Sequence, residues 1–180
     1  MRAFVAIDVG GPLEPTAPDG AEHAPAHLTL AFLGEVPAER IPAISAALRP
    51  VAADAASFEL TVGGIGAFPS HRTPRVVWVG VTTGREEVRR LAAAIADALS
   101  PIGFPRDPHD IVPHVTLFRV RSAASRARAR RLLDGSETPP PTRSLRIGEI
   151  VLKESTRTRD GRGHRTLERF PLSGRPSVGV

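Results

Sequence analysis

The sequence contains no cysteine, which excludes a disulfide scaffold, a thiol nucleophile and any zinc site with thiolate ligands. It has no apolar run long enough to span a membrane. It also lacks a Gly-x-Ser-x-Gly nucleophile elbow, so serine hydrolase chemistry has no support. The N-terminal residues carry a charge at Asp8 and are typical of a strand, not of a signal peptide. We therefore expect a soluble, cytoplasmic protein without membrane association.

Lysine is almost absent, since Lys153 is the only lysine among the 24 basic residues. The formal net charge is nevertheless +5, and nearly all of the positive charge is carried by arginine. The planar guanidinium group of arginine suits phosphate and therefore favours an anionic partner such as RNA. A GC-rich genome, which favours arginine codons, produces the same composition. Composition alone does not identify the function.

Local sequence patterns predict an alternation of strands and helices that restarts in the second half of the chain. The expected strands cover residues 2–9, 27–33, 57–67, 75–82, 114–120, 144–155 and 164–172. The expected helices begin after Pro37, at a Thr83–Glu86 capping box, and near residue 122. Residues 10–25 contain too many prolines and glycines for a helix. The restart predicts two similar lobes related by a pseudo-twofold axis, with a groove between them.

Each half contains one His-x-Thr-Leu motif, at His27–Leu30 and at His114–Leu117. Residues i and i+2 of a strand point to the same face, so each histidine projects with its threonine while the two apolar residues face the core. A single motif of this kind is usually structural. Two copies at the same place in a repeated unit indicate a site with two imidazoles, from His27 and His114, and two hydroxyls, from Thr29 and Thr116.

This set of groups suits the hydrolysis of a cyclic phosphodiester. The attacking water must lose a proton and the leaving alkoxide must gain one, and two imidazoles can supply both transfers near neutral pH. The threonine hydroxyls can bind the non-bridging phosphate oxygens, where charge is held in the transition state.

Further stretches carry a resemblance to a known family. They are Arg2–Asp8, His27–Val36, Arg75–Val81, Pro113–Leu117, Val151–Ser155 and Leu167–Leu172. With the doubled motif, they resemble the two-histidine (2H) phosphoesterase superfamily. Within it, they resemble the bacterial and archaeal 2′-5′ RNA ligase or RNA 2′,3′-cyclic phosphodiesterase family.

The resemblance implies one α/β (α+β) domain over residues 1–180, built as two lobes with antiparallel sheets and outer helices. It also implies a site without metal or cofactor that converts RNA 2′,3′-cyclic phosphate ends to 2′-phosphates, together with weak, reversible 2′-5′ ligation. His27 and His114 would be the catalytic residues, with Thr29, Thr116, Phe32 and Arg119 binding substrate. RNA ends or nucleotide cyclic phosphates would be the partners of a monomer.

Two positions in this scheme need an irregular strand. Phe32 and Arg119 each lie five residues after their histidine, which is the wrong parity for a straight strand. A bulge or the strand end must turn them into the groove. The short Pro- and Gly-rich segment 10–25 also departs from the family, whose members usually have a helix there.

Other readings of the sequence remain open. The same site could act on a cyclic phosphate of a small nucleotide, or the chain could be a nucleotide- or RNA-binding module without turnover. Asp107, His109, Asp110 and His114 lie close in sequence, but Pro108 and Pro113 make this segment a loop, and we expect no metal. The remaining histidines lie in polar, turn-rich contexts that predict exposed side chains; they are His23, His71 and His164.

Overall fold

The computed structural model describes the whole chain except residues 12, 14–25, 107–110, 159–160 and 176–180. The strands are β1 (Arg2–Asp8), β2 (His27–Glu35), β3 (Phe58–Phe68), β4 (Val76–Thr83), β5 (His114–Arg119), β6 (Arg143–Ile147), β7 (Glu149–Thr158) and β8 (Gly161–Pro171). The α-helices are α1 (Ile41–Asp54), α2 (Arg85–Leu99) and α3 (Ala123–Leu133). Two short 3₁₀ helices lie at Ala38–Arg40 and Ser100–Ile102.

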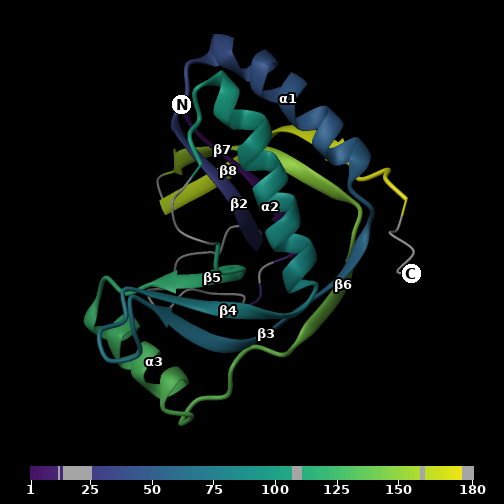
Figure 1. Cartoon of the computed structure of the whole chain (residues 1–180). Coiled ribbons are helices and arrows are strands. Elements are labelled where there is room, and N and C mark those ends of the chain that lie inside the picture. The colour runs from purple at the N-terminus through teal and green to yellow at the C-terminus, as the bar shows by residue number, and fades with distance from the viewer. Residues whose placement is uncertain (12, 14–25, 107–110, 159–160, 176–180) are drawn as a thin grey trace.

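All these strands join one curled antiparallel sheet in the order β6-β3-β4-β5-β2-β1-β7-β8. The sheet has two halves of four strands, and the two His-x-Thr strands, β5 and β2, meet at its centre (Figure 1). The pair that joins them, Leu28 with Val115, consists of corresponding residues of the two motifs. An antiparallel pair of equivalent residues places a pseudo-twofold axis between the strands. The expected α/β (α+β) fold with two related lobes is thus confirmed.

The lobes do not follow the order of the chain, contrary to the simple repeat that the sequence suggests. β3, from the first half of the sequence, pairs with β4 and β6 in the lobe of β5. β7 returns to pair with β1 in the lobe of β2. The single strand expected over 144–155 is therefore wrong. It is two strands that separate at Gly148 and run into opposite lobes, since β6 pairs with β3 and β7 with β1.

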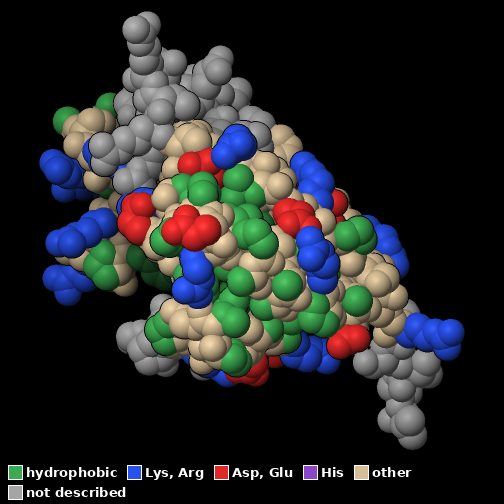
Figure 2. Space-filling model, turned by 90° about the horizontal axis from the view of Figure 1, so that it is seen from above, with side chains coloured by type: hydrophobic (Ala, Val, Ile, Leu, Met, Phe, Trp, Pro, Cys, Tyr) green, Lys and Arg blue, Asp and Glu red, His purple; other side chains and the backbone are tan. Residues whose placement is uncertain are grey.

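Helices α1 and α2 pack against each other and cover the sheet on the side of β2, β7 and β8, whereas α3 packs near β3 (Figure 1). The face of α2 that carries apolar residues at helical spacing is buried, as expected: it comprises Val88, Leu91, Ala92, Ile95 and Leu99. Figure 2 looks onto the outer side of this layer, where positive and negative side chains are interspersed with apolar ones.

The start of α2 differs from the expected Thr83–Glu86 capping box. Gly84 is the N-cap residue, with a φ of 82°, and no side chain makes a capping hydrogen bond. A Cβ atom at Gly84 would lie 2.5 Å from the carbonyl oxygen of Glu59. The close approach of β3 and the left-handed backbone therefore require glycine at this position.

Candidate active site

The first motif alternates as the sequence predicts. Leu28 and Leu30 on β2 are buried, with 0% and 6% of their surfaces exposed. His27 and Thr29 are half-buried on the opposite face. The strand therefore anchors in the core through its leucines and presents an imidazole and a hydroxyl on the other side.

The second motif repeats this arrangement on β5, where Val115 is buried, His114 is half-buried and Thr116 is exposed. Because β5 runs antiparallel to β2 and pairs with it at Leu28 and Val115, the polar faces of the two motifs lie on the same side of the sheet. The structure thus brings both histidines and both threonines to the centre of the sheet.

Both strands contain the bulge that the parity of Phe32 and Arg119 requires. The β1–β2 register skips Leu30, and the β4–β5 register skips Leu117, which is the equivalent residue of the second motif. A bulge shifts the following side chains to the other face. Phe32 is 79% exposed, and Arg119 is likewise exposed. Sequence parity therefore correctly predicted an irregular strand in both motifs.

Two aromatic rings surround His114. The ring of Phe68 packs edge-on at 4.9 Å between centroids, and the indole of Trp78 lies at 5.9 Å. Trp78 is opposite Gly66 of β3, where an added Cβ would come within 2.2 Å of the indole. Gly66 is therefore part of the seat of Trp78, and through Trp78 it supports the position of His114.

The hydrogen bonding of His114 defines which ring nitrogen is available. Its Nδ1 lies 2.7 Å from the carbonyl oxygen of Val112. A carbonyl oxygen accepts only, so Nδ1 carries the hydrogen and Nε2 of the neutral ring is left as the proton acceptor. Burial lowers the pKa of His114 below its ordinary value of 6.5, and the charge of Arg119 lowers it further, while the bond to Val112 acts in the opposite direction. The neutral form is favoured.

His27 has a different set of neighbours. The ring of Phe4 on β1 lies 5.2 Å from it, and the imidazole of His164 on β8 packs edge-on at 4.6 Å with the planes at 76°. Phe4 also contacts Phe32, at 6.2 Å. The expectation that His164 is exposed is wrong, because the pairing of β8 with β7 brings it over the face of the sheet that carries His27.

A buried ion pair lies beside His27. Asp8 is the cross-strand partner of His27, and its carboxylate accepts a hydrogen bond from the ammonium group of Lys153 on β7. Lys153 is only 4% exposed. The single lysine of the chain is therefore a buried group beside the candidate site, where a compact ammonium on a flexible stem fits and the larger planar guanidinium fits less well.

Several of these neighbours were missed by the sequence reasoning. Phe4 alternates with Asp8 along β1 and could have been placed on the polar face from strand period alone. The uniqueness of Lys153 was a compositional signal. Phe68, Trp78 and His164 reach the site through pairings between strands that are distant in sequence, so no local pattern predicts them.

In the described part of the chain, no group of three or more His, Asp or Glu side chains is arranged to hold a metal ion. The candidate ligands Asp107, His109 and Asp110 lie outside the described residues, as does His23. Within the described residues, no helix is long and apolar enough to cross a membrane.

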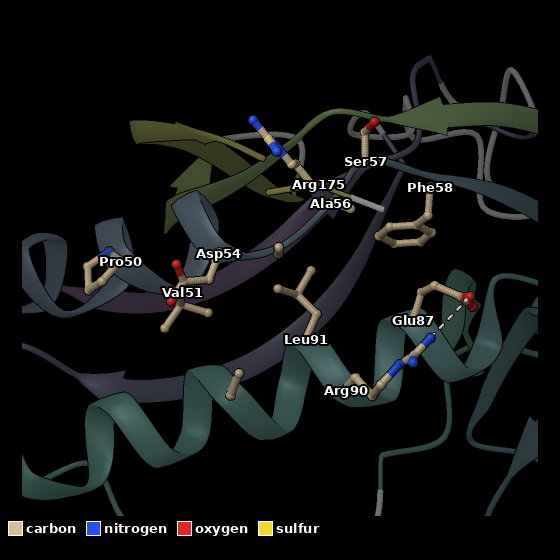
Figure 3. Close-up of a pocket in the computed structure, with 12 residues that line it drawn as sticks. Pro50, Val51, Asp54, Ala56, Ser57, Phe58, Glu87, Arg90, Leu91 and Arg175 are labelled. Atoms are coloured by element: carbon tan, nitrogen blue, oxygen red, sulfur yellow. Dashed lines mark hydrogen bonds and ion pairs between the residues drawn. The ribbon is translucent and has the colours of Figure 1, made fainter. Parts of the chain in front are cut away.

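A cavity of about 760 Å³ lies elsewhere, between the C-terminal half of α1 and the N-terminal half of α2 (Figure 3). Its lining includes Asp54, Glu87, Arg90 and Arg175 but no histidine. Arg90 is held by Glu87 at 3.3 Å. The cavity therefore lacks the acid and base groups that the central site provides.

Comparisons with known proteins agree with this geometry. An RNA 2′,3′-cyclic phosphodiesterase of Aeropyrum pernix is 35% identical over 141 residues, covering 78% of this chain and 78% of that protein. One from Thermotoga maritima is 29% identical and covers 97% of both chains.

Solved structures give the same result. The protein TT0787 of Thermus thermophilus has a TM-score of 0.74 at 25% identity, covering 97% of this chain and 99% of that chain. Escherichia coli LigT, solved with 3′-AMP, has a TM-score of 0.68 at 28% identity, covering 96% and 98%. The family model of the 2′-5′ RNA ligase superfamily matches residues 13–159, so the chain belongs to this superfamily.

Proposed function

We propose that the protein is an RNA 2′,3′-cyclic phosphodiesterase that hydrolyses cyclic phosphate ends by acid–base catalysis between His27 and His114. The observation that carries this proposal is the pairing of the two His-x-Thr strands at the centre of the sheet, with both polar faces on one side. Curated relatives that share about a third of its residues are named for this activity. We further propose that residues 1–180 form one domain of two lobes. Since one chain carries both motifs, the active unit is a monomer.

The surroundings of His114 support the role of general base. Its lowered pKa and the bond from Nδ1 to Val112 leave a neutral Nε2 that can take a proton from the attacking water. His27 is then the acid that gives its proton to the departing O3′. A bond forms from water to phosphorus, the bond from phosphorus to O3′ breaks, and the product carries a 2′-phosphate. The reverse sequence with a ribose hydroxyl in place of water gives 2′-5′ ligation.

The remaining residues hold the substrate in this scheme. In-line displacement places the attacking and leaving oxygens on opposite sides of phosphorus, so each histidine flanks the phosphate beside its own threonine. Thr29 and Thr116 donate to the non-bridging oxygens. Phe32, with its exposed ring, stacks on the terminal base, and Arg119 contacts the phosphate.

A second candidate is a cyclic phosphodiesterase of small nucleotides. It is favoured by one observation, namely that the similar E. coli LigT was solved with a mononucleotide, 3′-AMP. A site of two histidines and one exposed phenylalanine offers stacking for a single base and so does not by itself require a longer RNA.

One assay separates these functions. Purified protein is incubated with a 2′,3′-cyclic-phosphate-ended oligonucleotide and, separately, with cyclic mononucleotides, in EDTA, and the products are resolved by phosphorus NMR. We expect turnover in EDTA, a faster reaction on the oligonucleotide and a 2′-phosphate product. A preference for mononucleotides supports the second candidate. A 3′-phosphate product contradicts the roles given to the histidines, and binding without turnover indicates a binding module.

A further inference from the structure

The two histidines have matching neighbours except at one position. Each packs against one ring from the adjacent strand and one edge-on ring from a strand further out. Beside His114 the edge-on ring is Phe68, at 4.9 Å and 83°. Beside His27 it is His164, at 4.6 Å and 76°. The pseudo-symmetry of the site is therefore broken by a titratable imidazole on one side and a hydrocarbon ring on the other.

We propose that His164 is a positioning residue that retains the catalytic proton on His27, an inference that rests on the proposed function. Two imidazoles at this separation repel each other when both are charged. A neutral ring beside an imidazolium instead stabilises its charge through the ring electrons. The pair therefore takes up two protons in two separated steps and holds a single proton over a wider pH range than one isolated imidazole.

Other charged groups on the strands packed against this pair are balanced locally. Among the described residues, the carboxylates and cations on β1, β2, β7 and β8 around it are held in ion pairs. These ion pairs are Asp8–Lys153, Arg2–Glu35 and Glu154–Arg165. None of them changes its charge near neutral pH in the unperturbed state. The His27–His164 pair is thus the group of this lobe that titrates in the working range.

This arrangement fits the requirement of the reaction. The general acid must be protonated when the general base is neutral, and both conditions must hold at one pH. His164 extends the protonated range of His27 upward, while the apolar rings around His114 extend its neutral range downward. In each turnover His27 gives one proton to O3′, and the pair regains one proton from solvent while His114 releases the proton of water.

The first test is a titration that does not depend on activity. The Cε1–H signals of His27 and His164 are followed by NMR in the wild type, His164→Gln and His164→Phe, with His71→Gln as a control for loss of an exposed histidine. We expect two coupled steps in the wild type and in His71→Gln, and a single step for His27 in both His164 variants. An identical single step for His27 in the wild type and in His164→Gln overturns the inference.

The second test is the pH dependence of kcat on the cyclic-phosphate oligonucleotide. In His164→Gln and His164→Phe, we expect the alkaline limb to move down by about one pH unit, which is about a tenfold loss of rate above that limb. The rate at the optimum changes little, which distinguishes this effect from a misfolded site. Wild-type protein without turnover overturns the proposed function, whereas normal turnover with an unmoved alkaline limb, or with a moved acidic limb, overturns only the inference about His164.

Discussion

The two halves of the candidate site repeat one motif in different chemical surroundings. His114 packs against Phe68 and Trp78, and burial lowers its pKa. His27 packs against Phe4 and an imidazole, beside a buried ion pair. Apolar surroundings favour a neutral imidazole, whereas titratable and charged surroundings retain a proton more readily. The backbone repeat places two equivalent histidines, and their neighbours make them chemically different.

The largest effect is expected when either histidine is removed. His27→Ala and His114→Ala should each lower kcat by roughly 10²–10⁴-fold, because each removes one proton transfer. Both side chains lie on the half-buried face away from the helices, so the fold should persist. Steady-state kinetics measures the loss, and thermal melting of the same samples checks the fold. A variant with a near-wild-type rate contradicts the two-histidine mechanism.

The next effect in size concerns the threonines. Thr29→Ala and Thr116→Ala should lower kcat by roughly 10–10³-fold, since each removes one hydrogen bond to the charge of the transition state. Thr29→Ser and Thr116→Ser retain the hydroxyl and should keep most of the rate. If the alanine and serine variants are equally slow, the hydroxyls are not the groups that act. Unequal losses at the two threonines would show which lobe holds more of the charge.

The sequence alone predicted the parts of this site that depend on local period. The i, i+2 rule placed each histidine with its threonine, and the wrong parity of Phe32 and Arg119 required the bulges found at Leu30 and Leu117. Each of these features involves a few consecutive residues. Strand geometry is enough to predict them.

The parts that could not be predicted depend on which strands meet. Phe68 reaches His114 because β3 crosses into the lobe of β5, and His164 reaches His27 because β8 returns beside β7. The start of α2 was wrong for a related reason. The approach of Glu59 on β3 excludes a side chain at Gly84, and a capping pattern in the sequence carries no information about that contact.

A smaller effect is expected at Phe32, which has no counterpart on the side of His114. Phe32→Ala should raise KM about tenfold with little change in kcat, because base stacking contributes about 1–3 kcal/mol and the ring is already exposed. Phe32→Tyr keeps an aromatic face and should behave like the wild type. Steady-state kinetics on the oligonucleotide gives both constants. A fall in kcat at constant KM would instead place Phe32 in the chemical step.

Arg119 offers a way to alter the His114 side alone. Its charge contributes to the lowered pKa of His114, so Arg119→Gln should move the acidic limb of kcat/KM toward higher pH. The limb shift should be smaller than the full effect of burial, which is the largest cause. Arg121→Gln removes an exposed arginine two residues away and serves as the control. An acidic limb that moves equally in both variants would indicate a general effect of net charge.

The smallest effect concerns folding stability. Because burial lowers the pKa of His114 below 6.5, the unfolded chain binds this proton more readily than the folded chain. The contribution of His114 to stability is therefore complete above pH 6.5 and is lost as the pH falls from there through the lower pKa of the folded state. The slope for one proton does not exceed about 1.4 kcal/mol per pH unit.

A comparison with His114→Asn isolates this term. Asparagine does not titrate, and its amide can still donate toward the carbonyl of Val112, while every other ionisable group is common to both proteins. Urea unfolding between about pH 5 and pH 8 should give parallel free energies at the alkaline end, with the wild type losing more stability than the variant below pH 6.5. A constant difference across the range would mean that the folded and unfolded chains bind the His114 proton equally. The neutral imidazole required of the base would then lack its structural cause.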